Sequence, residues 1–257
     1  MSDMRGALYL VPNTLDLGAP GAPPDLQDVL PLGVIRVAAR LGDWIAENAK
    51  TTRAFLKRVD AVVLLAQPLR ALSIVEMPKP QKGGASAKAS SFDAAELLEP
   101  ALQGRDVGLI SEAGLPAVAD PGAVIVAAAH AHGVRVVSLP GASSLLLALA
   151  ASGLNGQSFA FVGYLPTDPA GRAARIKELE TLSRRLNQTQ LVIETPYRNA
   201  ALLAALVEHL QPSTRLSVSC GLTLANGFSR ADPVSGWRAR ATVLPGDMPA
   251  VFSILAG

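Results

Sequence analysis

Short apolar runs and longer helix-like segments alternate along most of this 257-residue chain. Apolar runs that end at turn-forming residues predict strands, and longer unbroken segments predict helices. The predicted strands cover residues 6–11, 43–46, 107–110, 134–139, 159–165, 190–193, 216–220, 241–244 and 251–255. The predicted helices cover residues 34–41, 50–58, 93–102, 123–132, 142–152, 169–186 and 199–210, while residues 62–65 fit either state. This alternation predicts an α/β fold with a largely parallel sheet that is covered on both faces.

The pair Pro140-Gly141 marks the expected boundary between two halves of the chain. We expect an N-terminal α/β domain over residues 1–139 and a C-terminal α/β domain over residues 140–257. The helix predicted after the boundary has no charged residue, so we expect it to be buried on all sides. Ser143 and Ser144 fall in its first turn, where their hydroxyls can cap the helix or contact a ligand; capping is the simpler interpretation.

The segment VGLISEAGLPAVADPG, from Val107 to Gly122, is the most informative part of the sequence. A predicted strand leads into a turn rich in glycine and proline, and a predicted helix follows. This is the usual geometry of a ligand site at the carboxyl end of a strand in an α/β sheet. Glycine and proline restrict such a turn and expose backbone amides that can face a ligand. Asp120 is interpreted as a residue that organises the turn and caps the next helix.

Composition narrows the possibilities without identifying a function. The chain is 49% hydrophobic and has a net charge of only +2, so it has ample core material and no overall nucleic-acid signature. The single cysteine, Cys220, excludes an internal disulfide and is expected to be buried and inert. No signal peptide is visible and the most apolar stretch, residues 142–151, is too short to cross a bilayer. We therefore expect a cytoplasmic protein without membrane association. Residues 78–91 are rich in Lys, Gly, Ser and Ala and show no apolar pattern, so we expect a mobile loop there.

Several familiar chemistries are missing from the sequence. No phosphate-binding Gly-Lys-Ser or Gly-Lys-Thr loop follows a strand, and the dinucleotide-binding Gly-x-Gly-x-x-Gly turn is absent. Cysteine and histidine do not occur in pairs at metal-binding spacing, so no metal site is predicted. The three histidines, His130, His132 and His209, are interpreted as ordinary solvated side chains.

Four segments occur in an order and at spacings that resemble a known family. They are ISEAGLPAVADPG (110–122), LPGASS (139–144), GYLP (163–166) and ETPYR (194–198). Together they resemble the tetrapyrrole methylase superfamily of S-adenosylmethionine-dependent methyltransferases. Within it they resemble the branch that methylates a cytidine 2'-hydroxyl of small-subunit ribosomal RNA, and still more closely a group of related putative methyltransferases. The resemblance extends over nearly the whole chain, from Gly6 to Leu255.

This resemblance implies two α/β domains with mostly parallel or mixed sheets, a cofactor cleft between them, and a homodimer. Pro12 and Asn13 would form the floor of the cleft, and the turn at 111–116 would be the main cofactor-binding element. Val118 and Ala119 would present backbone groups to the methionine part, and residues 195–197 would border the adenosine. The implied S-adenosylmethionine-binding residues are Pro12, Ser111, Glu112, Ala113, Gly114, Pro116, Val118, Ala119, Ser143, Ser144, Thr195, Pro196 and Tyr197.

A general base would help to remove the proton of a hydroxyl acceptor. Glu112 is the first candidate for this catalytic role and Glu47 the second. The alternative for Glu112 is a turn carboxylate that binds neighbouring backbone amides or the cofactor ribose.

The sequence departs from the ribosomal branch where a substrate would be recognised. The first turn, residues 12–16, lacks the branch's glycine, and residues 219–224 keep only the Leu-Thr of a charged element. We predict a methyltransferase that acts on ribosomal RNA at a ribose or a base. A small-molecule, tetrapyrrole-type methyltransferase and a non-catalytic cofactor-binding paralogue are the alternatives. The basic helix at 169–186 could contact phosphates or simply be a solvated face.

Overall fold

The structure, a computed structural model, describes residues 5–16, 19, 23–78, 93–240 and 242–257. The chain divides into two compact units, the N-unit (Met1–Thr14 and Asp25–Ala142) and the C-unit (Leu15–Pro24 and Ser143–Gly257). This division follows residue 142 rather than 139, and it assigns residues 15–24 to the C-unit, which the predicted domains did not. The loop predicted at 78–91 lies, except for residue 78, outside the described residues.

The N-unit contains a five-stranded sheet in the order β3-β2-β4-β1-β5, and all of its neighbouring strands are parallel. Its strands are β1 (Ala7–Leu10), β2 (Asp43–Ala46), β3 (Ser73–Glu76), β4 (Val107–Ile110) and β5 (Arg135–Ser138). Its helices are α1 (Leu26–Val29), α2 (Leu32–Arg40), α3 (Ala49–Val62), η1 (Leu69–Ala71), α4 (Ala94–Leu97), α5 (Glu99–Leu102) and α6 (Ala123–Ala131). Because each crossover carries helices, the sheet is the parallel, covered sheet that the sequence predicted.

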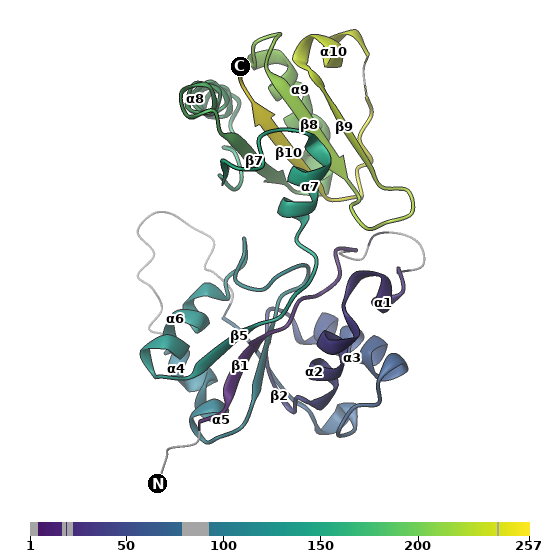
Figure 1. Ribbon diagram of the computed structural model, residues 1–257, viewed down its shortest axis with the longest axis vertical. Helices are drawn as coiled ribbons and strands as arrows, with labels where there is room; N and C mark the ends of the chain where they lie inside the picture. The colour runs from purple at the N-terminus through teal and green to yellow at the C-terminus, as the bar shows by residue number, and fades with distance from the viewer. Residues whose placement is uncertain (1–4, 17–18, 20–22, 79–92, 241) are drawn as a thin grey trace. The chain divides into compact units, whose positions relative to one another are not determined.

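Helices cover both faces of this sheet (Figure 1). Trp44 packs with side chains of α1, α2 and α3 on one face, and Leu109 packs with α5 and α6 on the other. The alternation of side chains along each strand separates the two clusters. Gly108 faces the Trp44 ring, and a Cβ at this position would lie 2.6 Å from the indole. A glycine in the middle of β4 is therefore what allows the indole to pack against the strand.

The C-unit contains a mixed five-stranded sheet in the order β6-β7-β10-β8-β9, in which only β6 and β7 are parallel. Its strands are β6 (Phe159–Phe161), β7 (Thr189–Glu194), β8 (Arg215–Cys220), β9 (Phe228–Pro233) and β10 (Ala250–Leu255). Its helices are α7 (Ser144–Ser152), α8 (Pro169–Leu186), η2 (Pro196–Arg198), α9 (Asn199–His209) and α10 (Val234–Ala239). The predicted α/β fold with parallel and mixed sheets is thus confirmed.

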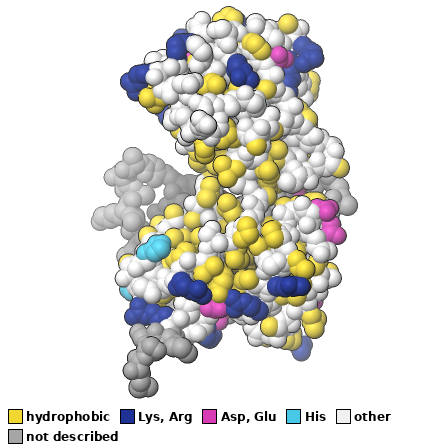
Figure 2. All heavy atoms as spheres, in the orientation of Figure 1, with side chains coloured by type: hydrophobic (Ala, Val, Ile, Leu, Met, Phe, Trp, Pro, Cys, Tyr) yellow, Lys and Arg dark blue, Asp and Glu magenta, His cyan; other side chains and the backbone are white. Residues whose placement is uncertain are grey.

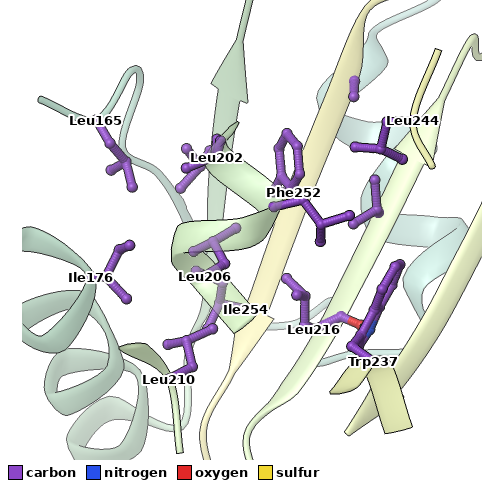
Figure 3. Close-up of a cluster of buried hydrophobic side chains, with 14 of the residues drawn as sticks. Leu165, Ile176, Leu202, Leu206, Leu210, Leu216, Trp237, Leu244, Phe252 and Ile254 are labelled. Carbon is purple, nitrogen blue, oxygen red and sulfur yellow. The ribbon is translucent and has the colours of Figure 1, made fainter. Parts of the chain in front are cut away.

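The larger core of the C-unit lies between its sheet and helices α8, α9 and α10. Figure 3 shows Phe252 and Ile254 of β10 among leucines of α9, with Trp237 of α10 beside Leu216. The Trp237 indole also donates a hydrogen bond to the Leu216 carbonyl, at 2.9 Å. The opposite face of the sheet packs against α7 through Leu145, Ala148 and Leu149. Cys220 is free and buried, as expected, and burial raises the pKa of its thiol.

Two predictions about α7 are wrong. The helix is not buried on all sides, because Leu146 and Leu147 are 52% and 38% exposed. A helix without charged residues can be buried on all sides, but its sequence does not show whether other elements actually surround it. Ser143 occupies the N-cap position, but its side chain makes no capping hydrogen bond. The helix instead ends at Gly153 in a left-handed conformation, with a φ of 63°.

Other differences concern exposed or polar segments. The strands β3 and β9 were not predicted; both lie at sheet edges, and neither contains a buried residue. The strand predicted at 241–244 is absent over residues 242–244, where Val243 is 92% exposed. Residue 62 ends α3, and residues 63–65 belong to no helix or strand. Within the described part of the chain, no helix is both long and apolar enough to cross a membrane.

Candidate functional site

The candidate site lies at the carboxyl edge of the N-unit sheet, which is the edge where its parallel strands end. β4 is flanked by β2 and β1, so the segments that follow these three strands adjoin one another. They contain Glu47 after β2, Asn13 after β1, and the turn from Ser111 to Gly122 after β4. Ligands of open parallel sheets bind outside this edge, which makes it the first place to look for a function.

Asn13 connects the segment after β1 to the turn after β4. Its side-chain amide donates hydrogen bonds to the carbonyl oxygens of Ser111 and Glu112, both at 3.1 Å. In the main chain, the Asn13 N–H donates a hydrogen bond to the Gly114 carbonyl at 2.9 Å, and the Gly114 N–H donates one to the Thr14 carbonyl at 3.3 Å. Asn13 is only 5% exposed, so these bonds are shielded from competing water.

Glu47 holds the same turn from the other side. Its carboxylate accepts a hydrogen bond from the backbone N–H of Glu112, at 3.0 Å. The predicted alternative for Glu112, a turn carboxylate that binds backbone amides, is therefore what Glu47 does in the structure. The side chain of Glu112 is itself exposed.

Asp120 is half-buried near these two carboxylates. Its pKa is raised from 3.8 to about 6, mainly by burial and further by the negative charges of Glu47 and Glu112, while the hydrogen bond with the Ser111 hydroxyl opposes the shift. The prediction that Asp120 caps the next helix is wrong, because the N-cap of α6 is Gly122 and no side chain caps it. Like charges that crowd one another are unfavourable for folding and are characteristic of functional sites.

The backbone of the turn is strained. Ala117 and Ala119 adopt left-handed conformations, with φ values of 67° and 64°, as does Gly114 at 67°. Each such alanine costs roughly 1–2 kcal/mol, because its Cβ crowds the following carbonyl. Val118 lies between them and is 43% exposed. Strain of this kind persists where the surrounding structure enforces it, and it is typical of ligand-binding segments.

The remaining predicted site residues belong to the C-unit. Thr195, Pro196 and Tyr197 follow β7, where the buried carboxylate of Glu194 accepts hydrogen bonds from the Thr195 N–H at 2.7 Å and from Arg198 at 2.8 Å. Tyr197 is 75% exposed, with the Arg198 guanidinium 5.6 Å from its ring centre. Sequence reasoning missed the organising role of Glu194, because the helical i,i+4 rule does not apply where β7 leads into η2.

The structure thus brings one group of predicted residues together and places the others elsewhere. Those assembled at the N-unit edge are Pro12, Glu47, Ser111, Glu112, Ala113, Gly114, Pro116, Val118 and Ala119. Ser143, Ser144 and residues 195–197 are in the other unit, so the cofactor cleft between the domains stays a prediction. Among the described residues, no group of three His, Cys, Asp or Glu side chains is placed to hold a metal ion.

The basic helix α8 is partly engaged within the protein. Arg175 forms an ion pair with Glu178 at 2.6 Å, and Arg184 donates to the main-chain carbonyl of Gly257 at 2.9 Å. Part of the helix's positive charge is therefore already paired, and a contact between α8 and RNA stays a prediction.

The sequence of this chain is similar to those of several known proteins. A model of the family described as Tetrapyrrole (Corrin/Porphyrin) Methylases matches residues 48–229. A ribosomal RNA small subunit methyltransferase I of Halalkalibacterium halodurans is 30% identical over 196 residues, which are 76% of this chain and 57% of that protein. Its counterpart from Mesorhizobium japonicum is 41% identical over 132 residues, 51% of this chain and 44% of that protein. The chain spans about half the length of the curated relatives it matches.

Two solved structures have a similar fold. The uroporphyrin-III-C-methyltransferase of Thermus thermophilus superposes with a TM-score of 0.53 at 21% identity, over 98% of this chain and 94% of that one. The methyltransferase CobJ superposes with a TM-score of 0.58 at 17% identity, over 98% and 95%. At these identities the likeness concerns the fold alone.

Proposed function

The chain belongs to the tetrapyrrole (corrin/porphyrin) methylases, and from this premise we propose that it is an S-adenosylmethionine-dependent methyltransferase that acts on ribosomal RNA. The observation that carries the proposal is the strained, doubly anchored turn at the carboxyl edge of the N-unit sheet. It coincides with the segment that the family resemblance assigns to the cofactor. The names of the similar curated proteins support RNA as the acceptor.

The charges of this edge fit the proposed cofactor. S-adenosylmethionine carries a positive sulfonium and an ammonium group, and Glu47, Glu112 and Asp120 contribute negative charge to the edge. A bound cation would relieve the repulsion that helps to raise the pKa of Asp120. The exposed residues Val118 and Ala119 and the Ser111–Pro116 turn would hold the methionine part. Thr195, Pro196 and Tyr197 would border the adenosine, as the resemblance implies.

The cofactor, when bound, supplies a methyl group on an already activated sulfonium, so the protein has mainly to align the acceptor and exclude water. The anchored turn would hold the cofactor's methionine part in one position for this alignment, because hydrogen bonds from Asn13 and Glu47 already fix its backbone. A hydroxyl acceptor must also lose its proton. Glu112 is our first candidate for the base because its carboxylate is exposed at the turn, and Asp120 joins it because of its raised pKa.

Exposed basic side chains on α8, such as Lys177 and Arg185, would contact RNA phosphates. A ribosomal acceptor would place the protein in the cytoplasm. The homodimer that the resemblance implies would be tested by sedimentation equilibrium. We assign the acceptor to ribosomal RNA without choosing between a ribose and a base.

Two measurements test the proposal. Calorimetric titration with S-adenosylmethionine and S-adenosylhomocysteine should give binding in the micromolar range. Methyl transfer should then be measured from labelled cofactor to total RNA and to small ribosomal subunits from a strain that lacks the protein. Transfer to subunits that declines steeply with salt supports the RNA assignment. If neither cofactor form binds, the methyltransferase proposal is wrong.

The departure at residues 219–224 favours one alternative. This segment has lost the charged side chains that the resemblance leads one to expect, so a cofactor-binding protein without catalysis is the second candidate. It predicts cofactor binding without transfer to RNA or to any small acceptor. Transfer to a tetrapyrrole but not to RNA would instead support the small-molecule alternative.

A further inference from the structure

Side chains continue the hydrogen-bond ladder of the N-unit sheet beyond the ends of its strands. The last main-chain bonds to β4 run from the Val11 N–H to the Leu109 carbonyl, at 2.9 Å, and from the Glu47 N–H to the Ile110 carbonyl, at 3.1 Å. β1 and β2 lie on opposite sides of β4, so these two bonds hold the strand from both flanks.

The next peptide group, between Ser111 and Glu112, is held in the same way by two side chains. Its carbonyl oxygen accepts from the Asn13 side-chain amide at 3.1 Å, and its N–H donates to the Glu47 carboxylate at 3.0 Å. The peptide is trans, so its C=O and N–H point in opposite directions, towards the two flanking strands. We call this arrangement the peptide clamp.

Each side chain of the clamp matches the group that it holds. The amide nitrogen of Asn13 can only donate, and it faces two carbonyl oxygens, while its oxygen accepts from the Thr14 N–H at 2.8 Å. That third bond fixes which way the amide points. The Glu47 carboxylate can only accept when ionised, and it faces an N–H. An acceptor in place of the Asn13 donor, or a donor in place of the Glu47 acceptor, would leave the peptide group facing a like hydrogen-bonding group.

We infer that Asn13 and Glu47 are positioning residues that fix the turn in its cofactor-binding conformation, and that Glu47 serves as a hydrogen-bond acceptor rather than as the general base. This inference rests on the proposed function for the identity of the ligand. A peptide fixed on both sides cannot rotate, so the turn does not have to be ordered when the cofactor arrives. The sequence hypothesis that Glu47 is a catalytic base is replaced by this role.

Three variants test the clamp through cofactor affinity. Asn13→Asp has nearly the same shape but places an oxygen against two carbonyl oxygens, and Glu47→Ala removes the acceptor. Each should raise the dissociation constant of S-adenosylhomocysteine, measured by calorimetry, about tenfold or more. Glu47→Gln keeps an acceptor oxygen and should stay within about threefold of the wild type.

Asp106→Asn supplies a matched control at the opposite edge of the same sheet. The Asp106 carboxylate also accepts a strand N–H, that of Ala7 at 2.9 Å, but it lies before β4 rather than after it. This variant should lower stability and leave cofactor affinity unchanged. Turnover separates positioning from base catalysis: Glu47→Gln should keep its kcat at saturating cofactor, whereas Glu47→Ala should mainly raise the KM for the cofactor.

The outcomes are distinguishable from a failure of the proposed function. If the wild type binds and both Asn13→Asp and Glu47→Ala bind equally well, the clamp is wrong. If Glu47→Gln binds but loses turnover, Glu47 is the base after all. If the wild type binds no cofactor, amide hydrogen exchange still decides: the Glu112 N–H should exchange faster in Glu47→Ala and not in Asp106→Asn. Equal exchange in all three proteins would overturn the inference.

Discussion

The two edges of the N-unit sheet differ in how their charged side chains are arranged. At the amino edge, opposite charges pair: Arg40 contacts Asp106 at 2.7 Å, and Arg105 contacts Asp43 at 3.2 Å. Figure 2 shows basic and acidic side chains next to one another on the lower part of this unit. At the carboxyl edge, the carboxylates of Glu47 and Glu112 repel that of Asp120. The first arrangement favours folding, and the second opposes it.

Two aspartates of the same sheet show the consequence. Burial raises the pKa of Asp106, but the hydrogen bonds from the Arg40 guanidinium and the Ala7 N–H outweigh it, so the net pKa is lowered. Burial also raises the pKa of Asp120, and there the neighbouring negative charges add to the effect and bring the pKa to about 6. The neighbouring groups, and not burial alone, therefore decide whether an ionised carboxylate favours the folded state or opposes it.

The largest expected change in stability comes from removing the interactions of Asp106 at the amino edge. Asp106→Ala removes the bond to Ala7 and the ion pair with Arg40, which should lower the free energy of unfolding by about 2 kcal/mol at pH 7, since both side chains are partly exposed. Urea unfolding measures this change. Because the pKa of Asp106 is lowered on folding, its contribution is complete well above pH 4 and is lost as the pH falls through that lowered value.

Cofactor affinity of Asp106→Ala should remain that of the wild type at temperatures where the variant is folded. A variant that is destabilised and also binds poorly would show that the two edges are not independent. Arg40→Ala provides the comparison, because it removes the ion pair but keeps the Ala7 bond, and it should cost less.

Sequence reasoning predicted this edge only in part, and the reason is physical. The bounds of β2, β4 and α8 follow from the local sequence and were predicted to the residue. The role of Asn13 could not be predicted, because its partners lie 98 and 99 residues away and adjoin it only in the strand order β2-β4-β1. The edge strands β3 and β9 lacked an apolar run, because their neighbours bury so little of them.

A second prediction removes charge from the carboxyl edge. Asp120→Asn should raise the free energy of unfolding at pH 8 by about 1 kcal/mol, an amount discounted because the group is half-exposed to solvent. The sign follows from its raised pKa: the folded protein holds a proton more tightly than the unfolded chain between pH 3.8 and about 6, so ionised Asp120 is unfavourable above that window. Urea unfolding at pH 8 and at pH 4 should show the gain shrinking with acid. An equal gain at both pH values would mean that charge is not its cause.

A third prediction uses the charge of the cofactor itself. S-adenosylmethionine has a sulfonium that S-adenosylhomocysteine lacks, so the ratio of their affinities reports the negative charge of the edge. This ratio should rise about threefold to fivefold in favour of the sulfonium form between pH 5 and pH 7, as Asp120 ionises. Calorimetry at the two pH values measures it. Asp120→Asn should give a ratio independent of pH, and a ratio that still rises would assign the effect to another group.

The smallest expected effect concerns the strained backbone of the turn. Ala119→Gly should raise the free energy of unfolding by about 0.5 kcal/mol, because relief of the left-handed strain slightly exceeds the added entropy of the unfolded chain. Ala127→Gly, in the middle of α6, should instead lower it by about 1 kcal/mol. Cofactor affinity shows whether the strain serves binding: Ala119→Gly should bind the cofactor more weakly, because its turn is freer, although the protein is more stable. If Ala119→Gly gained stability and bound as well as the wild type, the strain would be incidental and the clamp alone would prepare the turn.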